Sequence, residues 1–501
     1  MNRSLTLVKN IVWELSYYLL VILLGFLAPR YIILAYGSEV NGLSSTITQI
    51  LNVILILQAG ATTAAIYSLY KPIAENDMKN ICRGIAGAER FFKKISIIFG
   101  LIMIIVAVIT SVVIDSNLKQ IHIFIAFLIM GIKSFLDLFF TAKFRIVFTA
   151  YQEKFYISIA TLIEQVVYYL LVFATLALQW HFVFLYVWFL FGCIIKIIYL
   201  AIVFNQKHSD INTKLYREER AEIRGRNYSL ANEVSHSVIS SSVTILLTFM
   251  YGLEETSVYS VYALVSSALA LVSTAFYSSF GPTFGNLVAQ KNNESAGKVF
   301  GIFQYLFLMV NTFLMMCMTF LIIPFVRIYT AGVTDINYIN YFLVIMLALN
   351  GIFSAYRVPY NVIVSSCGYF KETWLQPVLT AILSGCISIV FGSWNYELII
   401  LGPIVFYAIN FLYQFFIIKK LAPRLINKRV FGLLGISILG LSLSFCATIN
   451  ISVPANVWWW LLSAIIFSIF ALLFIIISTL IVDREDLKST YEYMRRVLSR
   501  R

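Results

Sequence analysis

Apolar runs of about twenty residues recur along the whole sequence, and they constrain the fold more than any other feature. Each run is long enough to cross a hydrocarbon core of about 30 Å. Hydrophobic residues fill 60% of the 501 positions and charged residues only 12%, whereas an average soluble domain carries roughly twice that charge. The pattern therefore predicts an all-α integral membrane protein and leaves no room for a soluble domain.

The apolar runs predict about fourteen transmembrane helices. We place them at residues 11–36, 43–70, 95–114, 121–142, 155–178, 183–204, 229–250, 257–288, 299–323, 338–366, 373–393, 397–418, 430–449 and 457–482. The first run is too long for a signal-peptide core, and no small-residue cleavage site follows it. We therefore interpret it as a retained helix.

The distribution of basic residues predicts the orientation of these helices. If the N-terminus is inside, 31 of the 37 lysines and arginines fall in inner segments, two in outer loops and four within spans. Basic residues concentrate on the cytoplasmic side of multi-pass proteins. The protein is therefore expected in the cell's inner (plasma) membrane, with both termini in the cytoplasm. The net charge of +13 is then a topology signal first and an attraction to anionic lipid second, with no nucleic-acid partner expected.

The longest polar stretch divides the chain into two halves. Residues 205–228 are expected to be a cytoplasmic connector between an N-terminal six-helix bundle at 1–204 and a C-terminal six-helix bundle at 229–418. Residues 419–482 would hold an extra helix pair, and residues 483–501 a basic cytoplasmic tail.

Internal repetition supports this division. Tyr36-Gly37-Ser38-Glu39 follows the first predicted helix, and Tyr251-Gly252-Leu253-Glu254 follows the seventh. In each half a long helix then ends in a basic loop, at Lys71 and Lys291. Both halves start inside and contain an even number of spans. The repeats would therefore be parallel, which is one of the known transporter designs.

The helix count, the parallel repeat and the YGxExxG segment from Tyr36 to Gly42 resemble a known family. It is the O-unit (Wzx-type) polysaccharide flippase family of the multidrug/oligosaccharidyl-lipid/polysaccharide exporter superfamily. The resemblance implies two bundles that form a V around a central cavity. It also implies an activity, the flipping of undecaprenyl-pyrophosphate-linked oligosaccharide to the outer leaflet for surface polysaccharides such as lipopolysaccharide O-antigen. It transfers no binding residue onto a position of this chain.

Basic residues within the spans are the best pointers to a binding site. Each charge costs about 2.5–3.5 kcal/mol near the centre of a membrane helix, so it usually faces a cavity or a partner. The four candidates for binding pyrophosphate or sugar are Arg30, Lys133, Lys196 and Arg357. Lys133 could instead pair with Asp137 one turn later, and Arg30 could reach the outer interface.

Carboxylates in or near the spans are candidates for coupling transport to an ion. They are Asp137, Glu164, Glu14 and Glu233. Burial lets a carboxyl group titrate in a useful range, which favours Glu164. Glu14 and Glu233 lie near predicted cytoplasmic helix ends, where an exposed structural role is the alternative. No organic cofactor is expected, and a proton or a sodium ion is the candidate coupling ion.

Four deep cations against two deep carboxylates favour an anionic substrate such as pyrophosphate. A cation-coupled multidrug extruder of the same fold is the alternative transporter. A membrane oligosaccharide polymerase or glycosyltransferase is the alternative enzyme, but the outer loops are short for one.

No phosphate loop for ATP is present, and the six scattered cysteines show no metal-ligand spacing. Besides the bilayer and a lipid-linked oligosaccharide, glycosyltransferases or a polymerase of the same pathway are the expected partners.

Overall fold

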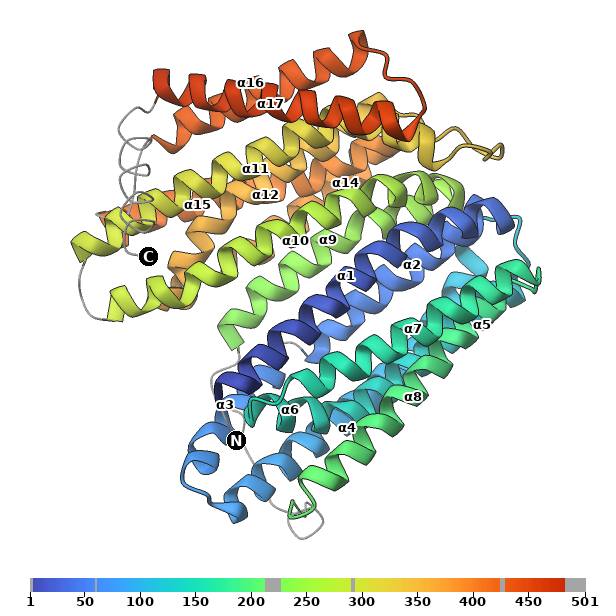
Figure 1. The fold of residues 1–501 in the computed structure, drawn as a ribbon, viewed down its shortest axis with the longest axis vertical. Coiled ribbons are helices and arrows are strands. Elements are labelled where there is room, and N and C mark those ends of the chain that lie inside the picture. Colours follow the sequence, from blue (N-terminus) through green and yellow to red (C-terminus); the bar gives the residue numbers. More distant parts are fainter. Residues whose placement is uncertain (1–2, 59–60, 212–226, 290–292, 424–428, 483–501) are drawn as a thin grey trace. The chain divides into compact units, whose positions relative to one another are not determined.

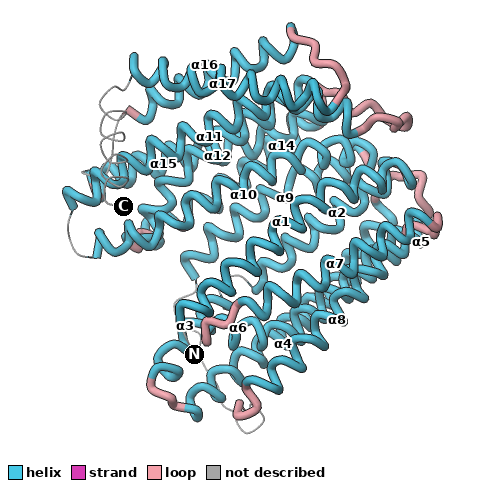
Figure 2. The backbone as a smooth tube through the Cα atoms, in the orientation of Figure 1, coloured by secondary structure: helices cyan, strands magenta, loops and turns pink. Residues whose placement is uncertain are grey.

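The computed structural model describes residues 3–58, 61–211, 227–289, 293–423 and 429–482 (Figure 1). Within these ranges every regular element is helical and no strand occurs (Figure 2). Thirteen of the helical segments are long and apolar enough to cross a membrane. The prediction of an all-α, multi-pass membrane protein is therefore confirmed. The predicted tail at 483–501 and most of the connector lie outside the described residues.

The helices follow the predicted order. They are α1 (Arg3–Tyr36), α2 (Ser38–Leu55), α3 (Ala61–Ala74), α4 (Met78–Val113), α5 (Gln120–Leu136), α6 (Ala142–Ala150), α7 (Phe155–Ala177), α8 (Val183–Lys207), α9 (Asn227–Tyr251), α10 (Leu253–Ala289), α11 (Asn293–Tyr329), α12 (Tyr341–Cys367), α13 (Phe370–Thr373), α14 (Leu375–Gly392), α15 (Leu401–Leu421), α16 (Val430–Asn450) and α17 (Val457–Val482).

Three predicted spans differ from the helices. The span at 43–70 consists of two helices, α2 and α3, and a 3₁₀ turn, η1 (Ile56–Gln58), follows α2. The span at 95–114 is the apolar part of α4, which begins at Met78, because lysine and arginine are good helix formers even where they are too polar for lipid. The span at 121–142 continues to Ala150 through a π-helical turn, η2 (Asp137–Thr141).

The repeated Tyr-Gly pair has the same structure in both places. Helix α1 ends at Tyr36 and α2 begins at Ser38, with only Gly37 between them at a φ of 83°. In the same way, Gly252 alone separates α9 from α10, at a φ of 97°. Glycine adopts this positive φ without the steric penalty that other residues pay. The two motifs therefore form equivalent turns, as expected for a duplicated unit.

The chain divides into two compact units. The N-terminal unit contains residues 1–237 and 251–257, and the C-terminal unit contains residues 238–250 and 258–501. The turn at 251–257 thus packs with the N-terminal unit, where Asn41 donates a hydrogen bond to Ser257 at 2.8 Å. The predicted domain bounds and the predicted V-shaped cavity stay predictions.

In the N-terminal unit, α7 packs against α1 and α8, and α5 packs against α2, α4 and α8. Its largest fully buried side chains include Phe92, Phe99, Phe127 and Phe148. Small residues bring the helices close together, as is usual in membranes. At Gly131 of α5, for example, an added Cβ would lie 3.2 Å from the Cβ of Met103 on α4. This packing places the polar residues of α5, α7 and α8 side by side.

In the C-terminal unit, α12 packs against α11 and α15, and α15 also packs against α14. The pair α16 and α17 packs on α11. Hydroxyl groups tie this pair to the bundle: Thr312 and Ser437 lie 2.6 Å apart, and Thr448 donates to the Thr319 carbonyl at 2.9 Å.

The outward faces of several helices are apolar. On α17, one face of large apolar side chains is exposed between Leu461 and Ile481, and on α4 the exposed apolar side chains run from Ile97 to Val113. Exposed apolar area of this extent is not found on soluble monomers. It fits helices that face lipid.

Candidate functional site

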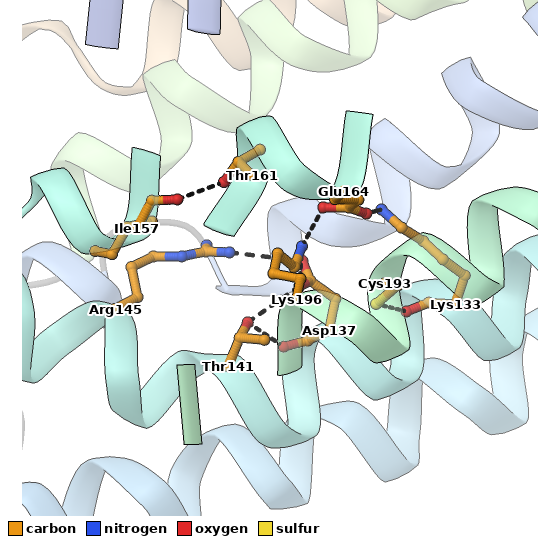
Figure 3. A network of polar contacts seen from close by, with 9 residues as sticks. All are labelled: Lys133, Asp137, Thr141, Arg145, Ile157, Thr161, Glu164, Cys193 and Lys196. Atoms are coloured by element: carbon orange, nitrogen blue, oxygen red, sulfur yellow. Dashed lines mark hydrogen bonds and ion pairs between the residues drawn. The ribbon is translucent and has the colours of Figure 1, made fainter. Parts of the chain in front are cut away.

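Charged side chains from five neighbouring elements of the N-terminal unit meet in one network, with Glu164 and Lys196 buried at its centre (Figure 3). Its members lie on α5, on the η2 turn and the α6 helix that follow it, on α7 and on α8. We call it the charge network. It consists of Lys133, Asp137, Arg145, Glu164 and Lys196.

Lys196 of α8 is the centre of the charge network. Its Nζ lies 2.6 Å from Oδ1 of Asp137 and 2.7 Å from Oε2 of Glu164. The lysine side chain is 8% exposed and that of Glu164 2%. Charged groups so deeply buried are stable only when they are paired. The two short contacts supply that pairing.

Lys133 of α5 is held less tightly. Its Nζ lies 3.3 Å from Oε1 of Glu164 and 4.2 Å from the centre of the Phe189 ring. The aromatic face attracts the ammonium group through a cation–π interaction. The lysine side chain is 15% exposed. The sequence left open whether Lys133 pairs with Asp137 or meets a ligand, and in the structure its ion-pair partner is Glu164.

Asp137 sits at the start of the π-helical turn. Its Oδ1 accepts a hydrogen bond from the Thr141 hydroxyl at 3.1 Å, and its Oδ2 lies 3.6 Å from a guanidinium nitrogen of Arg145. Such turns insert one extra residue and often occur at functional sites. Asp137 faces Lys196 and Arg145, which explains why the i, i+4 pair with Lys133 does not form.

Gly192 of α8 allows the network to assemble. A Cβ added there would lie 2.9 Å from the backbone oxygen of Glu164 and 3.4 Å from its Cγ. Any larger residue would push α7 away from α8 at the level of Glu164. Lys196 follows Gly192 by one helical turn, so the same close approach brings its ammonium to the Glu164 carboxylate.

The structure brings together half of the residues that the sequence singled out. Lys133, Asp137, Glu164 and Lys196 are the members of the charge network that sequence reasoning found. The remaining four candidates lie elsewhere: Arg30 is half-buried in α1, Glu14 pairs with Lys154 at 2.6 Å, Glu233 is exposed in α9, and Arg357 is buried in the C-terminal unit.

Sequence reasoning missed Arg145. It placed the end of the span at 142 and assigned this arginine to an inner loop. The helix in fact continues, and Asp137, Thr141 and Arg145 follow one another at intervals of four residues. That spacing was a usable signal, because residues four apart share a helix face.

Arg357 of α12 is the most buried basic residue in the described part of the C-terminal unit, with 6% exposure. Its guanidinium carbon lies 5.6 Å from the centre of the Tyr407 ring. Among the described residues its Nε has no hydrogen-bond partner and no carboxylate forms an ion pair with it. A buried charge without a counter-charge is costly. An incoming anion would remove that cost.

The described residues contain no group of three or more His, Cys, Asp or Glu side chains that could hold a metal ion. Three basic groups face two carboxylates, which leaves the network with a net charge of about +1.

The fold is that of known transporters. The structure is similar to an inward-facing multidrug resistance transporter of the MATE family in the MOP superfamily, with a TM-score of 0.66 and 11% identity over 83% of this chain and 98% of that one. It is also similar to the lipid II flippase MurJ in an inward closed conformation, with a TM-score of 0.65 and 15% identity over 95% and 99% of the two chains.

A third similar structure is a MOP superfamily transporter from Pyrococcus furiosus described as having a binding pocket of reverse polarity, with a TM-score of 0.53 and 11% identity over 83% and 96% of the chains. No protein-family model matches the sequence, and no curated protein matches it either. This chain is therefore a multi-pass membrane protein with the fold of MOP superfamily transporters. The resemblance drawn from the sequence is confirmed at the level of that fold.

Proposed function

We propose that this protein is a transporter that flips undecaprenyl-pyrophosphate-linked oligosaccharide from the cytoplasmic to the outer leaflet of the inner membrane. The saccharide would serve the assembly of surface polysaccharide. Both termini would lie in the cytoplasm, and the protein would expose its binding site to the two sides in turn. The similar folds include both a lipid II flippase and a multidrug transporter, so the choice between the two kinds of substrate depends on the charges.

The excess of basic groups over carboxylates in the charge network is the observation that carries this proposal. In the charge network, three cations face two carboxylates, and both carboxylates already have basic partners. A drug extruder for organic cations needs carboxylates that are open to the drug. A pyrophosphate needs cations that can give up a weak partner for a stronger one. Lys133 and Arg145 hold their carboxylates at 3.3 and 3.6 Å and fit that requirement.

Arg357 adds a further cation, in the C-terminal unit. Its guanidinium group has two edges that match the oxygens of a phosphate or a carboxylate. We propose that Arg357 binds an anionic group of the substrate, and that Arg30 and Lys196 contribute positive potential.

Reconstitution into liposomes tests the proposal. The substrate is a fluorescent undecaprenyl-pyrophosphate oligosaccharide, and the assay measures how much of it becomes accessible to a membrane-impermeant quencher on the opposite side. We expect flipping by the wild type and strongly reduced flipping by Lys133→Ala and Arg357→Ala at normal expression. Lys71→Ala is the control, because Lys71 pairs only with Glu75 on the surface, with its side chain 83% exposed. It should flip normally.

The same vesicles test the alternative. If the wild type moves no lipid-linked saccharide but drives efflux of organic cations in response to a proton or sodium gradient, the protein is a multidrug extruder. If flipping persists in both variants, the flippase stands but the cationic residues named here do not bind its substrate.

A further inference from the structure

The two oxygens of the Glu164 carboxylate have very different surroundings. Oε2 lies 2.7 Å from the Lys196 ammonium. Oε1 lies 3.3 Å from the Lys133 ammonium but is buried without any hydrogen-bond partner among the described residues. An ionised carboxylate oxygen in a buried site normally accepts one or more hydrogen bonds. Oε1 is therefore stabilised only by the positive charge of Lys133.

Asp137 differs from Glu164 in this respect. Its Oδ1 accepts from Lys196 and from the Thr141 hydroxyl, and its Oδ2 faces Arg145. Both oxygens of Asp137 thus have partners, and its side chain is 21% exposed against 2% for Glu164. If a cation leaves the network, the charge on Glu164 is the harder one to maintain.

Of the two cations that pair with Glu164, Lys133 is the one that an anionic ligand can remove more easily. Its contact with Glu164 is long, whereas both contacts of Lys196 are shorter than 2.8 Å. The Phe189 ring at 4.2 Å can keep attracting the ammonium while it turns toward a ligand. Once Lys133 has turned away, Lys196 alone would have to neutralise Glu164 and share in neutralising Asp137.

The charge count then favours the uptake of a proton. The empty network carries about one net positive charge. A pyrophosphate diester has one negative charge on each phosphate, so the occupied network would carry one net negative charge in a region of low dielectric constant. One proton on Oε1 of Glu164 would restore neutrality, and that oxygen has no other hydrogen to accept.

The other titratable groups around the network do not take this role. Tyr17 of α1 lies within electrostatic range of Glu164 and Lys196, and the Cys193 thiol of α8 faces the Lys133 carbonyl at 3.7 Å. Both are neutral, so neither can accept a proton. On α4, Lys93 pairs with Glu89 at 2.6 Å and lies over the Phe139 ring. Asp137 keeps its own partners.

We propose that Glu164 takes up one proton when a phosphate group draws Lys133 away from it, so that this site binds the anionic substrate and a proton together. The identity of the ligand rests on the function proposed above. The linkage is reciprocal: a proton on Glu164 frees Lys133 and raises the affinity for the anion by the same factor. Opposite charges thus favour each other's binding at this site.

Titration calorimetry of the full-length protein in detergent micelles tests this inference. The probe is a short-chain polyprenyl-pyrophosphate-linked sugar, because a diester has no phosphate group that titrates near neutral pH. Measuring the binding enthalpy in two buffers with different ionisation enthalpies gives the number of protons taken up. We expect about one proton per ligand, and a Kd that rises about tenfold per pH unit across the window in which the proton is taken up.

Two glutamate variants identify the group. Glu164→Gln imitates the protonated carboxyl, so it should bind the probe with no proton uptake and with a Kd that does not change with pH. Glu153→Gln is the matched control, because Glu153 is also a buried, paired glutamate of this unit but pairs with His208 at 3.1 Å, outside the network. It should keep the wild-type proton uptake.

The outcomes separate this inference from the proposed function. Binding by the wild type without proton uptake would refute the coupling and leave the flippase intact. Proton uptake that persists in Glu164→Gln would assign the proton to another group and refute the role of Glu164. No binding of the probe at any pH would instead count against the proposed substrate. Should Glu164→Gln fail to fold, the wild-type proton count and its pH dependence still decide the matter.

Discussion

Replacing Lys196 by methionine should strongly destabilise the protein. Methionine has a similar length but no charge, so Lys196→Met removes contacts of 2.6 and 2.7 Å to two carboxylates. Each carboxylate keeps one basic partner, at 3.3 or 3.6 Å. Breaking a buried ion pair from one side costs about 3–5 kcal/mol. We expect a loss at the lower end of that range, because the remaining partners compensate in part.

The Lys154–Glu14 pair supplies a control with the same chemistry and the same distance. Its Nζ–Oε1 separation is also 2.6 Å, but the lysine side chain is 49% exposed. Solvent screens such pairs, and they contribute about 0–1 kcal/mol. Lys154→Met should therefore lower the free energy of unfolding by much less than Lys196→Met, because Lys154 is exposed and pairs with Glu14, whereas Lys196 is buried and pairs with two carboxylates.

Equilibrium unfolding in detergent micelles, followed by circular dichroism, measures both variants. The comparison needs only the difference in the free energy of unfolding between each variant and the wild type. If Lys196→Met and Lys154→Met lose the same amount, the reasoning from burial is refuted, and the charge network would be no more than a set of surface-like ion pairs.

Two further predictions concern helix packing and pH. Gly192→Ala should destabilise the protein by about 1–3 kcal/mol, because its Cβ would lie 2.9 Å from the Glu164 backbone oxygen. Gly435→Ala, where a Cβ meets nothing within 4 Å, should stabilise it by about 0.4–1 kcal/mol. If the free energy of unfolding of Gly192→Ala is not lower than that of Gly435→Ala, the argument from helix packing is wrong. Burial, with His122 and Lys119 nearby, lowers the pKa of His181 below its ordinary 6.5. The unfolded chain then binds the proton more tightly, so stability is full above pH 6.5 and is lost as the pH falls through the lowered pKa. Acidification should lower the unfolding midpoint of the wild type more than that of His181→Asn.

The sequence predicted the helices well because lipid selects apolar residues over a fixed length. The predicted ends were wrong where a helix continues beyond its apolar part. Helix α4 begins at Met78, well before the apolar run, because the lysines and arginines of its first turns are good helix formers outside lipid. Hydropathy reports where a segment is buried in lipid and carries no signal for where the backbone stops being helical.

The candidate site could be predicted in part. A charged residue within a membrane span is visible in the sequence. Because such a charge is costly in free energy, it marks a candidate site, and four residues of the charge network were found in this way. The partner Arg145 could have been found from its spacing to Asp137 and Thr141. The other pairings could not be predicted, because they depend on the close approach of α7 and α8 at Gly192 and on the π-helical turn at Asp137. Both features arise from tertiary packing, and neither leaves a periodic pattern in the residues.

The charge network is an unfavourable way to hold helices together. Buried ion pairs can often be replaced by apolar residues of similar volume without loss of stability, and the surrounding helices already pack through small residues and aromatic rings. Five charged groups in one membrane-embedded unit therefore require a reason other than stability. The unequal contacts suggest one, since Lys196 is held at 2.6 and 2.7 Å while Lys133 and Arg145 are held at 3.3 and 3.6 Å. A network with one fixed cation and two loosely held cations can stay assembled and still exchange partners with an anion, and a network built only for stability would need no such difference.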